Sequence, residues 1–147
     1  MRKLNKRDEG FTYVETIVCM LIILILVLAI AVSSIKYIDQ AKITRARTDM
    51  DGFKKALDSY YLDCGAYPSK AQGLNALWEK PYLYPVPSAW DGPYLESEIP
   101  LDPWGNEYLY NVPGTNNLPY EIISLGSDGV EGGEKTAADI ISWKRRN

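Results

Sequence analysis

Side chains able to do acid–base or nucleophilic chemistry are sparse in this chain. Histidine, the commonest general base and metal-binding nitrogen, is absent from the 147 residues. No serine or cysteine stands beside an obvious base, and the paired acids Glu96/Glu98 and Glu131/Glu134 are interpreted as solvated loop charges. The sequence therefore contains no catalytic constellation, and it predicts a protein that is not an enzyme.

Glu15 is an acidic residue in an unusual position. It borders an apolar run, residues 16–35, that carries no formal charge. At about 1.5 Å per residue, a helix of that length spans the ~30 Å hydrocarbon core of a bilayer. A carboxylate entering lipid costs roughly 2.5–3.5 kcal/mol, so Glu15 should have a positively charged partner from another chain. Four basic residues precede the run and predict that this end stays in the cytoplasm: Arg2, Lys3, Lys6 and Arg7.

The basic leader followed by Gly10, Phe11 and Glu15 resembles the processing site of type IV prepilins. The resemblance implies that a membrane peptidase cuts between Gly10 and Phe11 and methylates the new N-terminal Phe11. It also implies that Glu15 pairs with the N-terminal amine of a neighbouring subunit during assembly. A secretory signal is disfavoured, because its apolar region has ~7–15 residues and ends in a small-residue cleavage site. The apolar run of this chain is longer, and no such cleavage site closes it. An uncleaved signal anchor is the other alternative.

Composition narrows the possible partners. Without residues 1–10 the chain keeps 12 basic and 17 acidic residues, a net formal charge of −5. Nucleic-acid binding requires a basic surface and is therefore not expected. Cys19 lies in the apolar run and Cys64 lies far beyond it, so we expect both thiols to be unpaired.

Apolar periodicity predicts one long helix, from about residue 12 to residue 62. Beyond the apolar run, apolar residues recur at spacings of three and four, with one gap: Ile35, Ile38, Ala46, Met50, Phe53, Leu57 and Tyr60. This stripe should pack on a globular domain, and Gly65 should end the helix in the left-handed conformation. Ser69 is then the predicted N-cap of a short helix.

Strand signals follow an aromatic, proline-rich loop at residues 81–93. Alternation predicts a strand at 107–112, a hairpin loop at 113–117, a returning strand at 120–125 and a third candidate at 139–143. The predicted fold class is α+β. We expect a pilin-like fold, in which the long N-terminal helix packs on a small antiparallel sheet with a C-terminal loop.

Three later segments resemble the major pseudopilins of type II secretion systems. They are Tyr67-Pro68 with Gln72-Gly73-Leu74, Asp102-Pro103-Trp104-Gly105-Asn106 with Tyr108, and Ser124–Gly129 with Glu131, Asp139 and Trp143. Together with the processing site, the resemblance covers nearly the whole mature chain.

The same resemblance implies a calcium site in the C-terminal loop. Its ligands would be the side chains of Asp128 and Asp139 and backbone carbonyls near Leu125 and Ser127. Calcium takes six to eight oxygen ligands, which carboxylates and glycine-exposed carbonyls supply. This chain has Ala137 where the family commonly has a further Asp, so we expect a weakened site unless Glu134, Thr136 or water supplies the missing ligand. A loop closed by hydrogen bonds alone is the alternative.

The predicted organisation is a cleaved leader at 1–10, a transmembrane and filament-core helix at 11–35, and a periplasmic domain at 36–147. The resemblance implies a structural subunit of the pseudopilus that drives export by type II secretion, located in the bacterial inner membrane and then in a periplasmic filament. The implied partners are copies of the chain itself, minor pseudopilins, the inner-membrane assembly platform and the prepilin peptidase. The alternatives are a type IV pilin for adhesion or motility and a signal-anchored periplasmic binding domain.

Overall fold

The computed structural model describes residues 12–144, apart from the side chains of residues 29–36. The described part of the chain divides into two compact units, with the boundary between residues 38 and 39. Gly10, Phe11 and the predicted leader lie outside the described residues. The predicted cleavage and domain boundaries therefore stay predictions.

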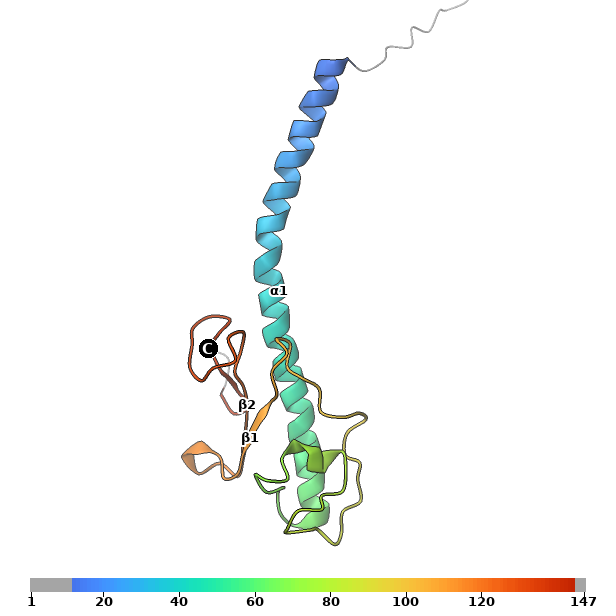
Figure 1. Ribbon diagram of the computed structural model, residues 1–147, viewed down its shortest axis with the longest axis vertical. Coiled ribbons are helices and arrows are strands. Elements are labelled where there is room, and N and C mark those ends of the chain that lie inside the picture. Colours follow the sequence, from blue (N-terminus) through green and yellow to red (C-terminus); the bar gives the residue numbers. More distant parts are fainter. Residues whose placement is uncertain (1–11, 145–147) are drawn as a thin grey trace, which may run out of the picture. The chain divides into compact units, whose positions relative to one another are not determined.

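The predicted long helix is confirmed as α1 (Tyr13–Cys64), which has 52 residues (Figure 1). The helix ends with the predicted left-handed glycine cap, since Gly65 has a φ of 73° and its N–H donates to the Tyr61 carbonyl at 2.8 Å. In the part of the chain that the structure describes, no helix has the combined length and apolarity required to cross a membrane.

A three-stranded antiparallel sheet follows, in the order β1-β2-β3. The strands are β1 (Leu109–Asn111), β2 (Glu121–Ser124) and β3 (Ile140–Ile141). Tyr110 pairs with Ile122 in the first ladder, and Ser124 pairs with Ile140 in the second. The predicted hairpin loop holds the short 3₁₀ helix η2 (Thr115–Asn117). All three predicted strands are confirmed, each shorter than the apolar pattern that predicted it.

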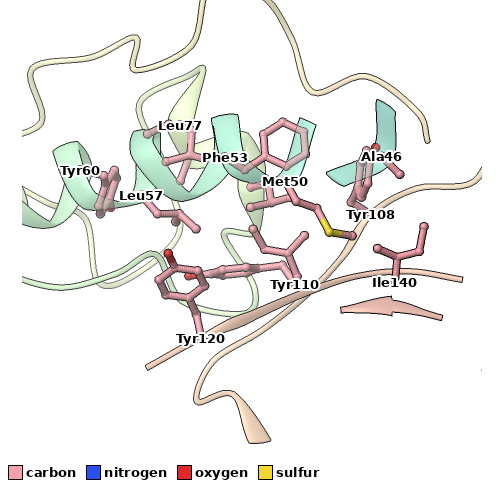
Figure 2. Packing of buried hydrophobic residues seen from close by; sticks show 14 residues of the cluster. Ala46, Met50, Phe53, Leu57, Tyr60, Leu77, Tyr108, Tyr110, Tyr120 and Ile140 are labelled. Atoms are coloured by element: carbon pink, nitrogen blue, oxygen red, sulfur yellow. The ribbon is translucent and has the colours of Figure 1, made fainter. Parts of the chain in front are cut away.

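The core of the second unit lies between the C-terminal part of α1 and the sheet, where Figure 2 shows the helix side chains facing three tyrosines. The helix contributes Ala46, Met50, Phe53, Leu57 and Tyr60, all at most 3% exposed. The predicted stripe is therefore correct over this range. Ile38 was wrongly included, because it is 56% exposed and belongs to the first unit, before the buried stripe begins.

The predicted short helix capped by Ser69 is replaced by a turn and a 3₁₀ helix, η1 (Leu74–Leu77). Ser69 N–H donates to Gln72 Oε1 at 2.8 Å, and Gln72 N–H donates back to the Ser69 carbonyl at 3.0 Å. Gly73 then takes a φ of 62°, which ends the turn before an α-helix forms. Gln72 Nε2 also donates to the carbonyls of Leu83 and Pro85, at 2.7 Å each, and so fixes the loop at 81–93.

Candidate functional site

The C-terminal loop, residues 125–139, connects two paired strands. Ser124 at the end of β2 pairs with Ile140 at the start of β3. Leu125 directly follows the first of these residues and Asp139 directly precedes the second. The ladder therefore brings together the two ends of the predicted calcium site, although they are far apart in sequence.

Backbone hydrogen bonds fold the loop back on itself. Ser127 N–H donates to the Thr136 carbonyl at 3.0 Å, and Asp139 N–H donates to the Gly132 carbonyl at 3.2 Å. Gly133 has a φ of 78°, and a Cβ on it would overlap the Ala137 carbonyl. Only glycine fits this position, because both the backbone conformation and the close approach exclude a side chain.

The Asp139 carboxylate is the strongest sign of a cation site. Its Oδ2 accepts the Gly132 N–H at 2.9 Å. Its Oδ1 is buried and accepts no hydrogen bond from any described residue. A carboxylate oxygen removed from water without a donor is costly, and a cation bound there would offset that cost.

The other acidic side chains of the loop do not form a cluster with Asp139. Among residues 12–144, no three His, Cys, Asp or Glu side chains are grouped closely enough to hold a metal by themselves. Asp128 is exposed, and its Oδ1 accepts the Val130 N–H at 3.2 Å, so Oδ2 is the oxygen that could bind a cation. Ala137 adds no carboxylate, so backbone oxygens from the start of the loop would have to complete the shell that calcium requires.

A buried network that the sequence analysis missed supports the start of the loop. Ser124 Oγ donates to Asp102 Oδ2 at 2.6 Å, and both residues are almost fully buried. The other oxygen, Oδ1, accepts the N–H groups of Trp104 at 3.0 Å and Asn106 at 2.8 Å. Asn106 Nδ2 in turn donates to the Gly126 carbonyl at 3.0 Å. These hydrogen bonds fix the start of the loop, and we call Asp102, Asn106 and Ser124 its buttress.

Glu15 lies in the first unit, so the structure does not bring it together with the loop. Its Oε2 accepts the Thr12 N–H at 3.3 Å, and its own N–H donates to Thr12 Oγ1 at 3.3 Å. This reciprocal pair is a capping box, for which the Thr-x-x-Glu spacing was an available signal. The Glu15 side chain is exposed. The predicted pairing with a neighbouring subunit stays a prediction.

Cys64 gives no nucleophile. The thiol is unpaired, as expected, and half-buried at the end of α1. Burial raises its pKa, against the opposing effect of hydrogen bonds with Tyr94 and Tyr60. A protonated thiol is a poor nucleophile, which agrees with the absence of catalytic chemistry.

A family model described as "Type II secretion system (T2SS), protein G" matches residues 33–143. The chain belongs to the type II secretion system protein G family. Its relatives include the core protein G of Pseudomonas aeruginosa, 43% identical over 95% of this chain and 97% of that protein. The Vibrio cholerae core protein G is 40% identical over 97% of this chain and 96% of the relative.

A solved structure supports the same assignment to the protein G family. The major pseudopilin from the type 2 secretion system of enterohaemorrhagic Escherichia coli superposes with a TM-score of 0.62 and 37% identity. The match covers 71% of this chain and 89% of that one. These findings confirm the pilin-like fold and the predicted family. The chain is a structural pseudopilus subunit, not an enzyme.

Proposed function

We propose that the chain is anchored in the inner membrane, cut after Gly10, methylated on Phe11, and then polymerised with other copies into a periplasmic pseudopilus. The observation that carries this proposal is the exposure of the apolar part of α1. Every large apolar side chain from Ile17 to Leu28 is at least 41% exposed. Lipid or neighbouring copies must cover such a surface, because contiguous apolar patches of this size are rare on soluble monomers.

The apolar surface of α1 would contact lipid in the precursor and neighbouring copies in the filament. Residues 16–35 carry no charge and are long enough for a bilayer, which supports a membrane-anchored precursor. In the filament the same surface would pack against other copies and form the core. Head-to-tail contacts that do not close into a ring generate a helical polymer of this kind. The prepilin peptidase would process the membrane-anchored precursor, and minor pseudopilins and an inner-membrane assembly platform would take part in the polymerisation.

Glu15 is the proposed selector of register in the polymer. Its capping bonds to Thr12 are 3.3 Å long, so its exposed carboxylate remains available to the amine of a neighbouring Phe11. Glu15→Ala should abolish filament assembly, whereas Glu15→Asp should retain part of it because the charge is kept. The packing of residues 39–147 should be unchanged in both variants, as judged by near-ultraviolet circular dichroism. Assembly of Glu15→Ala at the unchanged level would contradict this role.

Processing is tested by the intact mass of the chain extracted from membranes of cells with and without the prepilin peptidase. The proposal requires the loss of residues 1–10 and the gain of one methyl group, both dependent on the enzyme. A chain of unchanged mass in both strains would refute processing and favour the alternative, a signal-anchored domain.

We also propose that the loop at 125–139 binds calcium through Asp128, Asp139 and the carbonyls of Leu125 and Ser127. The ion would cross-link the two ends of the loop and stabilise it. The support is the unpartnered, buried Oδ1 of Asp139, together with the pairing of β2 and β3 beside it.

Calcium binding is tested by calorimetric titration and by thermal unfolding with calcium, magnesium or chelator. We expect calcium to raise the melting temperature of the unchanged chain, and Asp139→Asn to remove the increase. Glu131→Gln is the matched control, since Glu131 is an exposed acid of the same loop whose side chain is not a proposed ligand. Equal calcium responses in all three proteins would refute the site.

A further inference from the structure

Strand β1 has a free edge that borders a cavity. Within the described chain, β1 pairs only with β2. The cavity has a volume of about 400 Å³, within the range of about 300–1,000 Å³ that is usual for ligand sites. Its lining combines residues 107–110 with residues 70–75 and 99–101. Successive strand residues belong to opposite faces of a sheet, so a cavity that touches all of 107–110 lies at the edge of the strand.

The register of the sheet shows which main-chain groups of β1 face this edge. The Ile122 carbonyl accepts the Ser142 N–H at 2.9 Å, and the Ile122 N–H donates to Ser142 Oγ at 3.1 Å. Both main-chain groups of Ile122 therefore face β3. Tyr110 is the partner of Ile122 in β1 and occupies a non-hydrogen-bonded position of that ladder. The N–H and C=O of Tyr110 are consequently directed away from β2, toward the free edge.

Tyr110 thus has an unpaired main-chain donor and acceptor at a mostly buried position. The residue is 7% exposed, and neither group forms a hydrogen bond with a described residue outside the ladder. Tyr108 lies two residues earlier, is 8% exposed, and also lacks a main-chain hydrogen bond within the described chain. Main-chain groups removed from water without a partner cost free energy comparable to a lost hydrogen bond. A ligand that pairs with this edge would recover that cost.

An extended polypeptide matches the edge in spacing and in charge. Outward-facing groups on alternate strand residues recur about every 7 Å, and another strand presents donors and acceptors at the same interval. Lys70 and Glu107 are exposed in the lining of the cavity, and neither forms an ion pair in the described chain. Lys70 disfavours a free cation and Glu107 disfavours a free anion, whereas a segment with one basic and one acidic side chain suits both.

We propose that the free edge of β1 is a peptide-binding site, which receives an extended segment of a partner protein as a fourth strand of the sheet. Main-chain hydrogen bonds would supply the affinity, as is general for binding by strand addition. Lys70 and Glu107 would favour segments that carry both charges. The inference depends neither on polymerisation nor on calcium, and it gives the second unit a binding role of its own.

Three peptides with the same side chains test main-chain recognition by the full chain in detergent. The probe is the blocked heptapeptide Thr-Val-Lys-Thr-Val-Glu-Thr. One derivative is N-methylated on alternate residues and keeps one hydrogen-bonding edge, whereas the other is N-methylated on consecutive residues and keeps neither. We expect the dissociation constants of the first two peptides to agree within about threefold, and the third peptide to bind at least about tenfold more weakly, because it cannot form the main-chain bonds.

Amide hydrogen exchange locates the bound probe on the chain. At saturation, exchange of the Tyr110 amide should slow by at least about tenfold, because its N–H gains an acceptor. Leu109 and Asn111 already occupy the hydrogen-bonded positions of the ladder with β2, so exchange of their amides should change by less than about twofold. This contrast between neighbouring residues distinguishes pairing at the edge from a general stabilisation of the domain.

Leu101→Trp tests the cavity itself. Leu101 lines the cavity, is 53% exposed and lies outside the buried core, so the larger side chain should narrow the site and weaken the probe by at least about tenfold. Leu62→Trp is the matched control at an 82% exposed position outside the cavity lining, and its affinity should stay within about twofold. Near-ultraviolet circular dichroism of both variants verifies that they fold.

Four results would overturn the proposal. The first is Tyr110 exchange that does not slow at about 1 mM probe, a concentration that detects binding energies of about 4 kcal/mol. The second is equal binding of the three peptides, which would mean recognition through side chains alone. The third is unchanged binding of the probe to Leu101→Trp. The fourth is Tyr110 exchange that slows with increasing concentration of the chain alone, which would assign the edge to a second copy.

Discussion

Ser124→Ala is the substitution that tests the buried buttress most directly. Ser124 is 0% exposed, and its hydroxyl is the donor to Asp102 Oδ2 at 2.6 Å. Alanine would remove that donor and leave a carboxylate oxygen buried without a partner. A hydrogen bond to a charged group contributes about 1.5–3 kcal/mol, so we expect the free energy of unfolding to fall by about 2–3 kcal/mol.

Ser124→Ala should destabilise the C-terminal loop locally, in addition to lowering the stability of the whole domain. The Gly126 N–H, which donates to Ser124 Oγ at 3.4 Å, would lose its acceptor at the start of the loop. Amide hydrogen exchange at Gly126 and Ser127 should therefore accelerate more than exchange in β1. For a domain of about 110 residues, a loss of 2–3 kcal/mol lowers the melting temperature by roughly 8–12 °C.

The assay is thermal and denaturant unfolding of the full chain in detergent, followed by near-ultraviolet circular dichroism. Ser127→Ala is the matched control, because Ser127 is exposed and its hydroxyl makes only a 3.5 Å contact with Thr136 Oγ1. This control should change the unfolding free energy by less than about 0.5 kcal/mol. A Ser124→Ala loss no larger than that of the control would refute the buttress.

Three further predictions concern the core and its edge. Leu57→Ala should cost about 2–5 kcal/mol in denaturant unfolding, because Leu57 is fully buried, whereas Leu62→Ala, at an 82% exposed position, should cost less than about 0.5 kcal/mol; equal losses would contradict the observed helix face. Burial raises the pKa of Tyr60 to about 12. The unfolded chain therefore releases this proton first, so stability should fall as the pH rises from about 10 to 12, and Tyr60→Phe should reduce that slope; an unchanged slope would show that Tyr60 does not contribute. Cys64 should react with a maleimide at least about tenfold faster in the unfolded chain than in the folded one, because burial keeps the thiol protonated, and equal rates would contradict its placement.

Sequence reasoning succeeded where one periodicity dominates. The three- and four-residue spacing from Ala46 to Tyr60 predicted the buried face of α1, and the alternation around Tyr110 predicted β1. These signals are local, because a helix or strand repeats the same geometry along its length. Thr12 and Glu15 also form a local capping-box signal for the start of α1.

The contacts that hold the loop could not be read in the same way. Asp102 and Ser124 are distant in sequence, and each is an ordinary polar residue until the fold buries the pair. The turn at Ser69 was misread because a serine cap predicts an α-helix, whereas Gly73 and the bonds of Gln72 to the loop at 81–93 favour a turn and 3₁₀ helix. Tertiary contacts determine the conformation of such short segments, since their intrinsic helix stability is small.

Assembly of the chain into a pseudopilus is tested by a helical reconstruction of filaments formed by the unchanged chain. We expect a polymer whose core consists of the apolar N-terminal part of α1 from many copies, with residues 39–147 on the outside and residues 1–10 absent. Filaments with residues 39–147 at the core, or a chain that forms no filament beside the other secretion components, would contradict it.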